Sequence, residues 1–261
     1  MKKNSIIAVA AVVVLGGLAA YFLYKPAPPE PVLVQAPPPP APVIRQVIET
    51  PPASTPLPVL DESDGVMLDA LSGLINDPSL VKMFIAKQII RNIVATVDNL
   101  PGKQAPMEVM PVEPAAGKFI TAGTLNRPTI SPKNAERYAP YIKIANGLDT
   151  KSLVNLYVTL YPLFQEAYED LGYPKQYFND RLLVAIDNLL ATPDIGEPIQ
   201  LTQPNVYYLY ADPTLEERSI GQRILMRIGK QNRDVIMSKL TEVREELKRH
   251  MREIAASEIS G

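Results

Sequence analysis

Proline makes up 13 of the 34 residues from position 26 to position 59, and this density restricts the fold more than any other feature. Proline fixes φ and carries no amide hydrogen, so neither a helix nor a central strand continues through such a segment. The polyproline II conformation that it favours rises about 3.1 Å per residue, so the segment reaches roughly 100 Å at most. We therefore predict a stiff linker at residues 25–59. A docking site for a proline-recognising partner is the alternative interpretation.

An uncharged stretch of 19 residues, from Ile6 to Tyr24, precedes this linker and follows Lys2 and Lys3. As a helix it is about 28 Å long, close to the thickness of the hydrocarbon core of a bilayer. Basic residues on its amino-terminal side favour a cytoplasmic amino terminus. We therefore predict a cytoplasmic segment at residues 1–5, a single transmembrane anchor at 6–24 in a bacterial inner membrane, and a domain at 60–261 in the periplasm. A cleaved signal peptide is the alternative, although the apolar run continues beyond the small residues at 18–20.

The charge and cysteine content of the predicted domain exclude several classes of protein. Residues 60–214 carry 12 Lys/Arg and 18 Asp/Glu, whereas residues 215–261 carry 10 and 8. Neither part has the strong positive field that nucleic-acid binding requires. The chain has no cysteine, which excludes a structural disulfide and a thiolate metal site. The sequence contains no cofactor-binding motif. The predicted domain has about 200 residues, which are enough to bury a hydrophobic core without a disulfide or a metal to stabilise it.

Apolar residues at helical spacing predict a mainly α, bundle-like domain with one small β-hairpin. Capping residues and first-turn prolines place helix starts at Ser63 or Asp64, at Asp77-Pro78, at Ser131-Pro132 and at Asp149. The second of these helices is expected to run to Asn99 and the third to Gly147. The fourth should reach Leu171, with a kink or a break at Pro162. Further helices are predicted at 175–191, 212–229 and 232–256.

The connecting segments carry weaker signals. Residues 103–130 are predicted to form an irregular segment that contains one short strand at 118–121. Residues 197–210 are predicted to form the β-hairpin. The last helix has apolar residues at near-heptad spacing, from Ile236 to Ile254. We expect it to pack on its own domain. Self-association is the alternative, and the sequence leaves the oligomeric state open.

Catalytic signatures are not found in the sequence. The single histidine, His250, lies on a charged helix without a second ligand or a nucleophile motif. Four acids, Asp98, Glu166, Asp187 and Asp212, have apolar or aromatic neighbours that could perturb a carboxylate. Each also has an ordinary interpretation as a helix end, an exposed face or a cap. We predict no catalytic residue and no metal site.

Two groups of residues are candidates for binding. Ten of the twelve tyrosines fall between Tyr138 and Tyr210, and Tyr157, Tyr161 and Tyr168 repeat on one helix face. Core packing is the ordinary interpretation of these rings, and a groove for a sugar or a peptide is the functional one. Arg223, Arg227 and Lys230 align at i, i+4 and i+7. This predicts either a solvated face or a basic stripe that meets an acidic wall polymer or partner.

Several strings together resemble a proteobacterial family catalogued as domain of unknown function 3014. They are Leu60-Asp61-Glu62-Ser63-Asp64, Ala95-Thr96-Val97-Asp98-Asn99-Leu100, Arg137-Tyr138, Leu160 to Tyr168, Leu171-Gly172-Tyr173-Pro174, Leu189-Leu190-Ala191-Thr192-Pro193, Ala211-Asp212-Pro213 and Leu215-Glu216. The resemblance spans about residues 57–250. It implies an amino-terminal membrane helix and a proline-rich spacer, and it brings no activity and no catalytic residue.

Three functions follow from these observations. The first is a non-catalytic interaction or scaffolding module of the cell envelope, with an envelope protein or the cell wall as its partner. The second is a carboxylate-dependent cell-wall hydrolase or its accessory. The third is a ligand-binding module that uses the tyrosine-rich region.

Overall fold

The computed structural model describes residues 56–75 and 77–260, with side chains to residue 252. The predicted cytoplasmic segment at 1–5, the anchor at 6–24 and almost all of the linker at 25–59 lie outside the described residues. None of the helices in the described ranges has the length and hydropathy that crossing a membrane requires.

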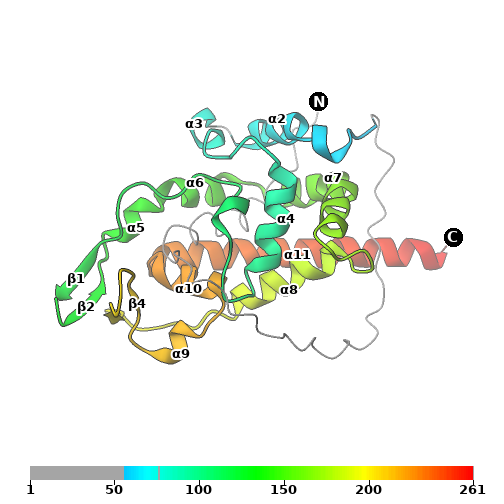
Figure 1. Cartoon of the computed structure of the whole chain (residues 1–261). Helices are drawn as coiled ribbons and strands as arrows, with labels where there is room; N and C mark the ends of the chain where they lie inside the picture. Colours follow the sequence, from blue (N-terminus) through cyan, green and yellow to red (C-terminus); the bar gives the residue numbers. More distant parts are fainter. Residues whose placement is uncertain (1–55, 76, 261) are drawn as a thin grey trace.

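The described chain is mainly helical, as predicted (Figure 1). Its helices are the short 3₁₀ turns η1 (Leu60–Glu62) and η2 (Met107–Val109), and α2 (Asp64–Leu74), α3 (Pro78–Val81), α4 (Ile89–Asn99), α5 (Asn134–Arg137), α6 (Ala139–Gly147), α7 (Thr150–Asp170), α8 (Phe178–Leu190), α9 (Pro213–Glu216), α10 (Ile220–Arg227) and α11 (Lys230–Ser260). The strands are β1 (Thr121–Thr124), β2 (Arg127–Ile130), β3 (Leu201–Thr202) and β4 (Leu209–Tyr210).

The long helix α11 runs along the molecule and packs against α6, α7 and α8 (Figure 1). Four of its aliphatic residues are completely buried, namely Ile236, Leu240, Val243 and Leu247. Burial of one such side chain stabilises a fold by about 1.5–3 kcal/mol. The apolar residues at near-heptad spacing therefore pack against helices of the same chain, which confirms the prediction that this helix packs on its own domain.

Two predicted helix starts are confirmed by their caps. The Asp77 carboxylate accepts a hydrogen bond from the Ser79 amide at 2.9 Å, and Asp149 accepts one from the Ser152 amide at 2.8 Å. These bonds satisfy amides that the first turn leaves without helical partners. Local sequence decides both starts, because cap and amide lie within three residues of each other.

Pro162 was expected to kink or break its helix, and the break is wrong, because α7 continues from Thr150 to Asp170, while a kink stays a prediction. Pro162 lies on the exposed side of the helix, whereas its neighbours Tyr161 and Leu163 are buried in the core. Packing on both sides of the proline outweighs the loss of one backbone hydrogen bond.

The single helix predicted from Asp77 to Asn99 is also wrong. The chain leaves the helix after α3, and Phe84 forms a bridge with Val112 before α4 begins. Gln88 takes a left-handed conformation with φ 53°, and the Asp64 carboxylate accepts the amides of Gln88 and Ile89 at 2.8 Å each. Ser63 or Asp64 was expected to cap α2. Ser63 occupies the cap position without a side-chain capping bond, and Asp64 caps α4 instead, because the tertiary fold brings that helix end to it.

Two other predicted helices are divided in the structure. The range predicted as one helix at 131–147 contains α5 and α6, which meet at the buried Tyr138. The range predicted at 212–229 contains α9 and α10. The second division occurs at Ser219, whose hydroxyl accepts the Gln222 amide at 3.2 Å and so starts α10 anew. The helix predicted at 175–191 is confirmed as α8.

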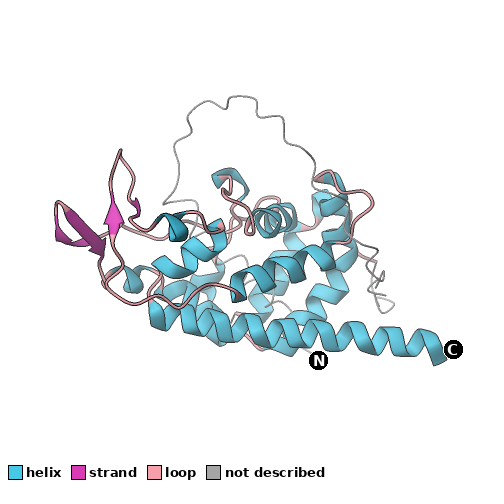
Figure 2. Cartoon of the chain, turned by 90° about the horizontal axis from the view of Figure 1, so that it is seen from below, coloured by secondary structure: helices cyan, strands magenta, loops and turns pink. Residues whose placement is uncertain are grey.

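The strands form two antiparallel hairpins, β1–β2 and β3–β4. The hairpin predicted at 197–210 is confirmed, whereas the β1–β2 hairpin was missed and lies just after the strand predicted at 118–121. The two are joined by the bridge Thr129↔Gln200 and by a hydrogen bond from the Ile130 amide to the Ile199 carbonyl at 3.0 Å. They lie together at one end of the molecule (Figure 2), and we call β1 to β4 the β end.

Candidate functional site: a cavity at the base of the β end

A cavity of about 300 Å³ lies where the β end meets the helical body. Its walls come from the β1–β2 hairpin, the turn into α5, the loop before β3 and the carboxyl end of α10. Much of the lining is apolar and includes Ile130, Pro132, Pro198, Ile199 and Met226. The polar lining residues are Thr129, Ser131, Asn134, Glu197 and Arg227. A small apolar cavity with a few polar groups is the usual form of a small-ligand site.

One wall is held by Asn134, which is buried. Its side-chain amide donates to the carbonyls of Ile120 at 2.6 Å and Ser131 at 2.9 Å, and its oxygen accepts the Ile120 amide at 3.0 Å. These bonds tie the chain entering β1 to the start of α5. Because its hydrogen bonds are used within the fold, Asn134 shapes the wall.

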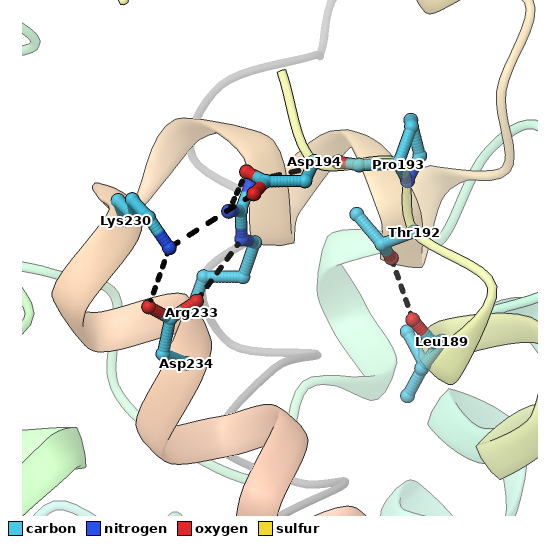
Figure 3. A network of polar contacts seen from close by, with 7 residues as sticks. All are labelled: Leu189, Thr192, Pro193, Asp194, Lys230, Arg233 and Asp234. Carbon is cyan, nitrogen blue, oxygen red and sulfur yellow. Dashed lines mark hydrogen bonds and ion pairs between the residues drawn. The ribbon is translucent and has the colours of Figure 1, made fainter. Parts of the chain in front are cut away.

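The chain segments that lead to Glu197 and away from Gly229 are tied together by a network of charged groups (Figure 3). Arg233, buried on α11, forms an ion pair with Asp194 and donates to the Pro193 carbonyl at 3.4 Å. The Arg233 guanidinium holds the pKa of Asp194 below its usual range. Lys230 pairs with Asp234 at 2.8 Å in the same network. The network joins the loop before the cis peptide Glu197-Pro198 to the start of α11.

The most unusual group in the cavity wall is Arg227, whose side chain is only 3% exposed. Its Nη2 donates to the Tyr208 carbonyl at 2.8 Å, and the guanidinium carbon lies 4.7 Å from the centre of the Tyr210 ring and 5.7 Å from that of Phe119. Its Nε has no hydrogen-bond partner among the described residues. The ion pairs found within the described residues do not include Arg227.

The neighbouring phenols do not neutralise this charge. Burial raises the pKa of Tyr210 to about 12, although the nearby Arg227 acts in the opposite direction. Burial likewise raises the pKa of Tyr138 far above its usual value. Both hydroxyls therefore stay protonated at neutral pH, and the rings around Arg227 contact it as neutral π systems.

The expected basic stripe does not form one surface. Arg223 is buried, pairs with Glu216 and donates to the Lys103 carbonyl. Arg227 lines the cavity, and only Lys230 is well exposed. The predicted alignment of all three is wrong, because α10 ends at Arg227, Gly229 takes a left-handed conformation with φ 89°, and Lys230 begins α11. Only Arg223 and Arg227 share a helix, and the fold covers both of them. An exposed stripe was therefore wrong, and any role of these residues in binding stays a prediction.

The three predicted tyrosines lie in the hydrophobic core, with exposed fractions of 1–4%. The Tyr157 ring meets Tyr161 edge-on at 5.8 Å, and Tyr168 stacks on Tyr173 at 4.6 Å. The ordinary interpretation as core packing is confirmed. The rings present almost no exposed face to a ligand, so their predicted role in binding has no support from the described surface.

The four candidate acids lie apart from one another, each with its own contacts or surface position. Asp98 pairs with Arg181 at 2.7 Å, Asp187 pairs with Arg244, and Asp212 accepts the Thr214 amide at 2.8 Å as the cap of α9. Glu166 is exposed on α7. His250 lies on α11 near Glu246, whose pKa is lowered first by Arg249 and to a smaller extent by His250. Within the described residues no cluster of three acids or histidines is suited to a metal.

Sequence reasoning missed two features. Asp180, in the first turn of α8, has a pKa that burial raises above its usual value, and it lies near Tyr157 and Tyr161. It resembles any first-turn acid in sequence. The cavity was missed because its polar residues come from distant segments, and only Arg227 carried a signal, through its spacing.

The comparisons with known proteins are limited to one family. The family described as "Protein of unknown function (DUF3014)" matches residues 89–244. No curated protein and no solved structure matches the chain. The matched range includes every residue that lines the cavity.

Proposed function

The chain belongs to the DUF3014 family of proteins of unknown function, and from this premise we propose that it is a non-catalytic interaction module of the bacterial cell envelope. In this proposal residues 6–24 anchor the chain in the inner membrane and residues 25–59 carry the domain into the periplasm. The uncharged run after Lys2 and Lys3 and the proline density of the linker support this arrangement.

The observation that carries the proposal is the β end, where two hairpins present aliphatic residues at their turns. Leu125, between β1 and β2, is fully exposed at 101%, and Val206, between β3 and β4, is 78% exposed. One exposed aliphatic residue is ordinary on a protein surface. Two on adjoining hairpins give exposed apolar contacts of the kind that a protein partner uses.

The position of the β end suits this role. The first described residues pack through η1 on α7, at the opposite end of the molecule from the hairpins (Figure 1). A linker that enters there leaves the β end directed away from its attachment. The module therefore holds its partner, an envelope protein, at the side remote from the anchor.

Site-specific photocrosslinking in cells tests the proposal. A photoreactive residue at position 125 or 206 is expected to give a discrete crosslinked product in the membrane fraction. Position 184 is the matched control, because Val184 is also an exposed aliphatic residue, 50% exposed, but lies on α8. Crosslinking at position 184 that equals crosslinking at positions 125 and 206 would contradict the proposal.

Topology needs a separate measurement. Protease added to spheroplasts should degrade the domain, and cytoplasmic markers should stay intact. Removal of residues 6–24 should release the domain from the membrane fraction. A domain that resists external protease but is digested after lysis would place it in the cytoplasm and reject the envelope part of the proposal.

A further inference from the structure

Arg227 and Arg223 lie one turn apart on α10, and both are buried. The fold supplies Arg223 with the Glu216 carboxylate. It supplies Arg227 with the Tyr208 carbonyl, the Tyr210 hydroxyl and two aromatic rings, and with no carboxylate from the described residues. The two arginines therefore differ in whether the chain itself neutralises them.

A buried arginine without a carboxylate partner, such as Arg227, is energetically costly because of its charge. Removing an ion from water is costly, and buried charges in proteins are nearly always paired. Cation–π contacts compensate for part of this cost. The position at the carboxyl end of α10 adds a small favourable contribution. Arg227 also lines a cavity that admits a ligand, so an anionic group from outside the chain can complete its surroundings.

Glu197 narrows the choice of ligand. It lies on the cavity wall, is exposed, and is not part of an ion pair with any described residue. A phosphate would meet one arginine together with this acid, whereas phosphate sites usually gather several donors. A group with a carboxylate at one position and an N–H donor at another suits both walls. The Thr129 hydroxyl, which makes no hydrogen bond within the described chain, adds a neutral polar contact.

The remaining lining sets the size and polarity of the ligand. Ile130, Pro132, Ile199 and Met226 give apolar surface, and about 300 Å³ is at the small end for ligand pockets. A large or highly charged ligand does not fit such a space. A small aliphatic side chain beside the carboxylate does.

We propose that this cavity binds a small aliphatic α-amino carboxylate, with its carboxylate on Arg227 and its α-nitrogen toward Glu197. A free amino acid and the carboxyl-terminal residue of a peptide share this chemistry. The inference rests on the proposed function and deepens it, because it names the chemical group that the β end of the module receives.

Calorimetric titration of the purified full chain in detergent tests the ligand. Alanine is expected to bind, and alaninamide, which lacks the carboxylate, is expected not to bind. Alanylalanine separates the two sources, since a peptide end should bind more tightly than free alanine if the natural ligand is a peptide. Equal binding of alanine and alaninamide, or of alanine and inorganic phosphate, would overturn the proposal, as would the absence of binding by both alanine and alanylalanine.

Variants test the two walls separately. Arg227→Met should weaken alanine binding about 30-fold or more, because truncating one member of a buried charge pair has effects of that size. Glu197→Gln should weaken the binding of alanine, whose ammonium is charged, more than the binding of N-acetylalanine, whose uncharged N–H can still donate to the glutamine. Lys151→Met is the matched control, because it removes an exposed cation of α7 that does not line the cavity. A loss in Lys151→Met equal to that in Arg227→Met would reject a specific role for Arg227.

A second variant keeps the test decisive if Arg227→Met does not fold. Ala122 is exposed at the cavity wall, so Ala122→Phe should fold and reduce alanine binding about tenfold by occupying the cavity. Unchanged binding in Ala122→Phe would place the ligand elsewhere. If neither alanine nor alanylalanine binds while crosslinking at position 125 persists, this inference fails and the proposed interaction module stands.

Discussion

Replacing Asp64 by alanine tests whether a single carboxylate fixes the start of α4. Each of its oxygens accepts one backbone amide, from Gln88 and Ile89, at 2.8 Å. Removing a helix cap costs about 0.5–2 kcal/mol, and a hydrogen bond to a charged group is worth about 1.5–3 kcal/mol. Ile89 is completely buried, so water does not readily replace its lost acceptor. We therefore expect Asp64→Ala to lower the free energy of unfolding by about 2–3 kcal/mol.

Urea unfolding of the purified protein, followed by circular dichroism, measures this difference. Asp64→Asn retains one acceptor and should lose about half as much stability. Asp69→Ala is the matched control, because Asp69 is an exposed acid on the same helix, and its effect should stay within about 0.5 kcal/mol. Hydrogen exchange should become faster at the Gln88 and Ile89 amides in Asp64→Ala. Equal unfolding midpoints for Asp64→Ala and Asp69→Ala would refute the reasoning.

Three more substitutions test the packing. Tyr157→Phe should stabilise the protein by about 1 kcal/mol in urea unfolding, because the buried Tyr157 hydroxyl has no partner in the described chain; a loss of stability would contradict this. Burial raises the pKa of Asp180, so its ionisation destabilises the fold as the pH rises through that pKa. Asp180→Asn should therefore be more stable than the native protein at pH 7, and the difference should vanish below the usual pKa of 3.8, which a pH series of unfolding midpoints checks. Gly221→Ala places a Cβ 2.5 Å from Leu189 Cδ2 and should lower the free energy of unfolding by about 2 kcal/mol. Gly73→Ala is the control, because its Cβ meets open space and should not destabilise the protein. Equal effects of the two substitutions on the melting temperature would show that the contact relaxes.

The features that sequence predicted correctly are those in which cause and effect lie close together in the chain. The caps at Asp77 and Asp149 act on amides two and three residues away. The apolar spacing of the last helix predicted its buried face from Ile236 to Leu247. The linker predicted at 25–59 and the anchor predicted at 6–24 rest on composition alone and stay predictions, because almost all of these residues lie outside the described ranges.

The errors share a different cause. Pro162 lies in a continuous helix because buried neighbours on both sides hold it. The predicted helix from Asp77 to Asn99 is divided because Phe84 pairs with Val112 and Asp64 caps the second part. In each case a remote segment supplied a contact that outweighed local preference.

The candidate site belongs almost entirely to this second group. Helical spacing placed Arg223 and Arg227 one turn apart on α10, and the sequence determined that much, whereas Lys230 starts α11 after Gly229. Whether each arginine meets water, a carboxylate or a cavity was decided by the β end, the loop at Glu197 and the chain near Lys103, which all come from elsewhere. The physical reason is that periodicity depends on the geometry of one helix, whereas the burial and pairing of a charge depend on which distant groups the folded chain brings beside it.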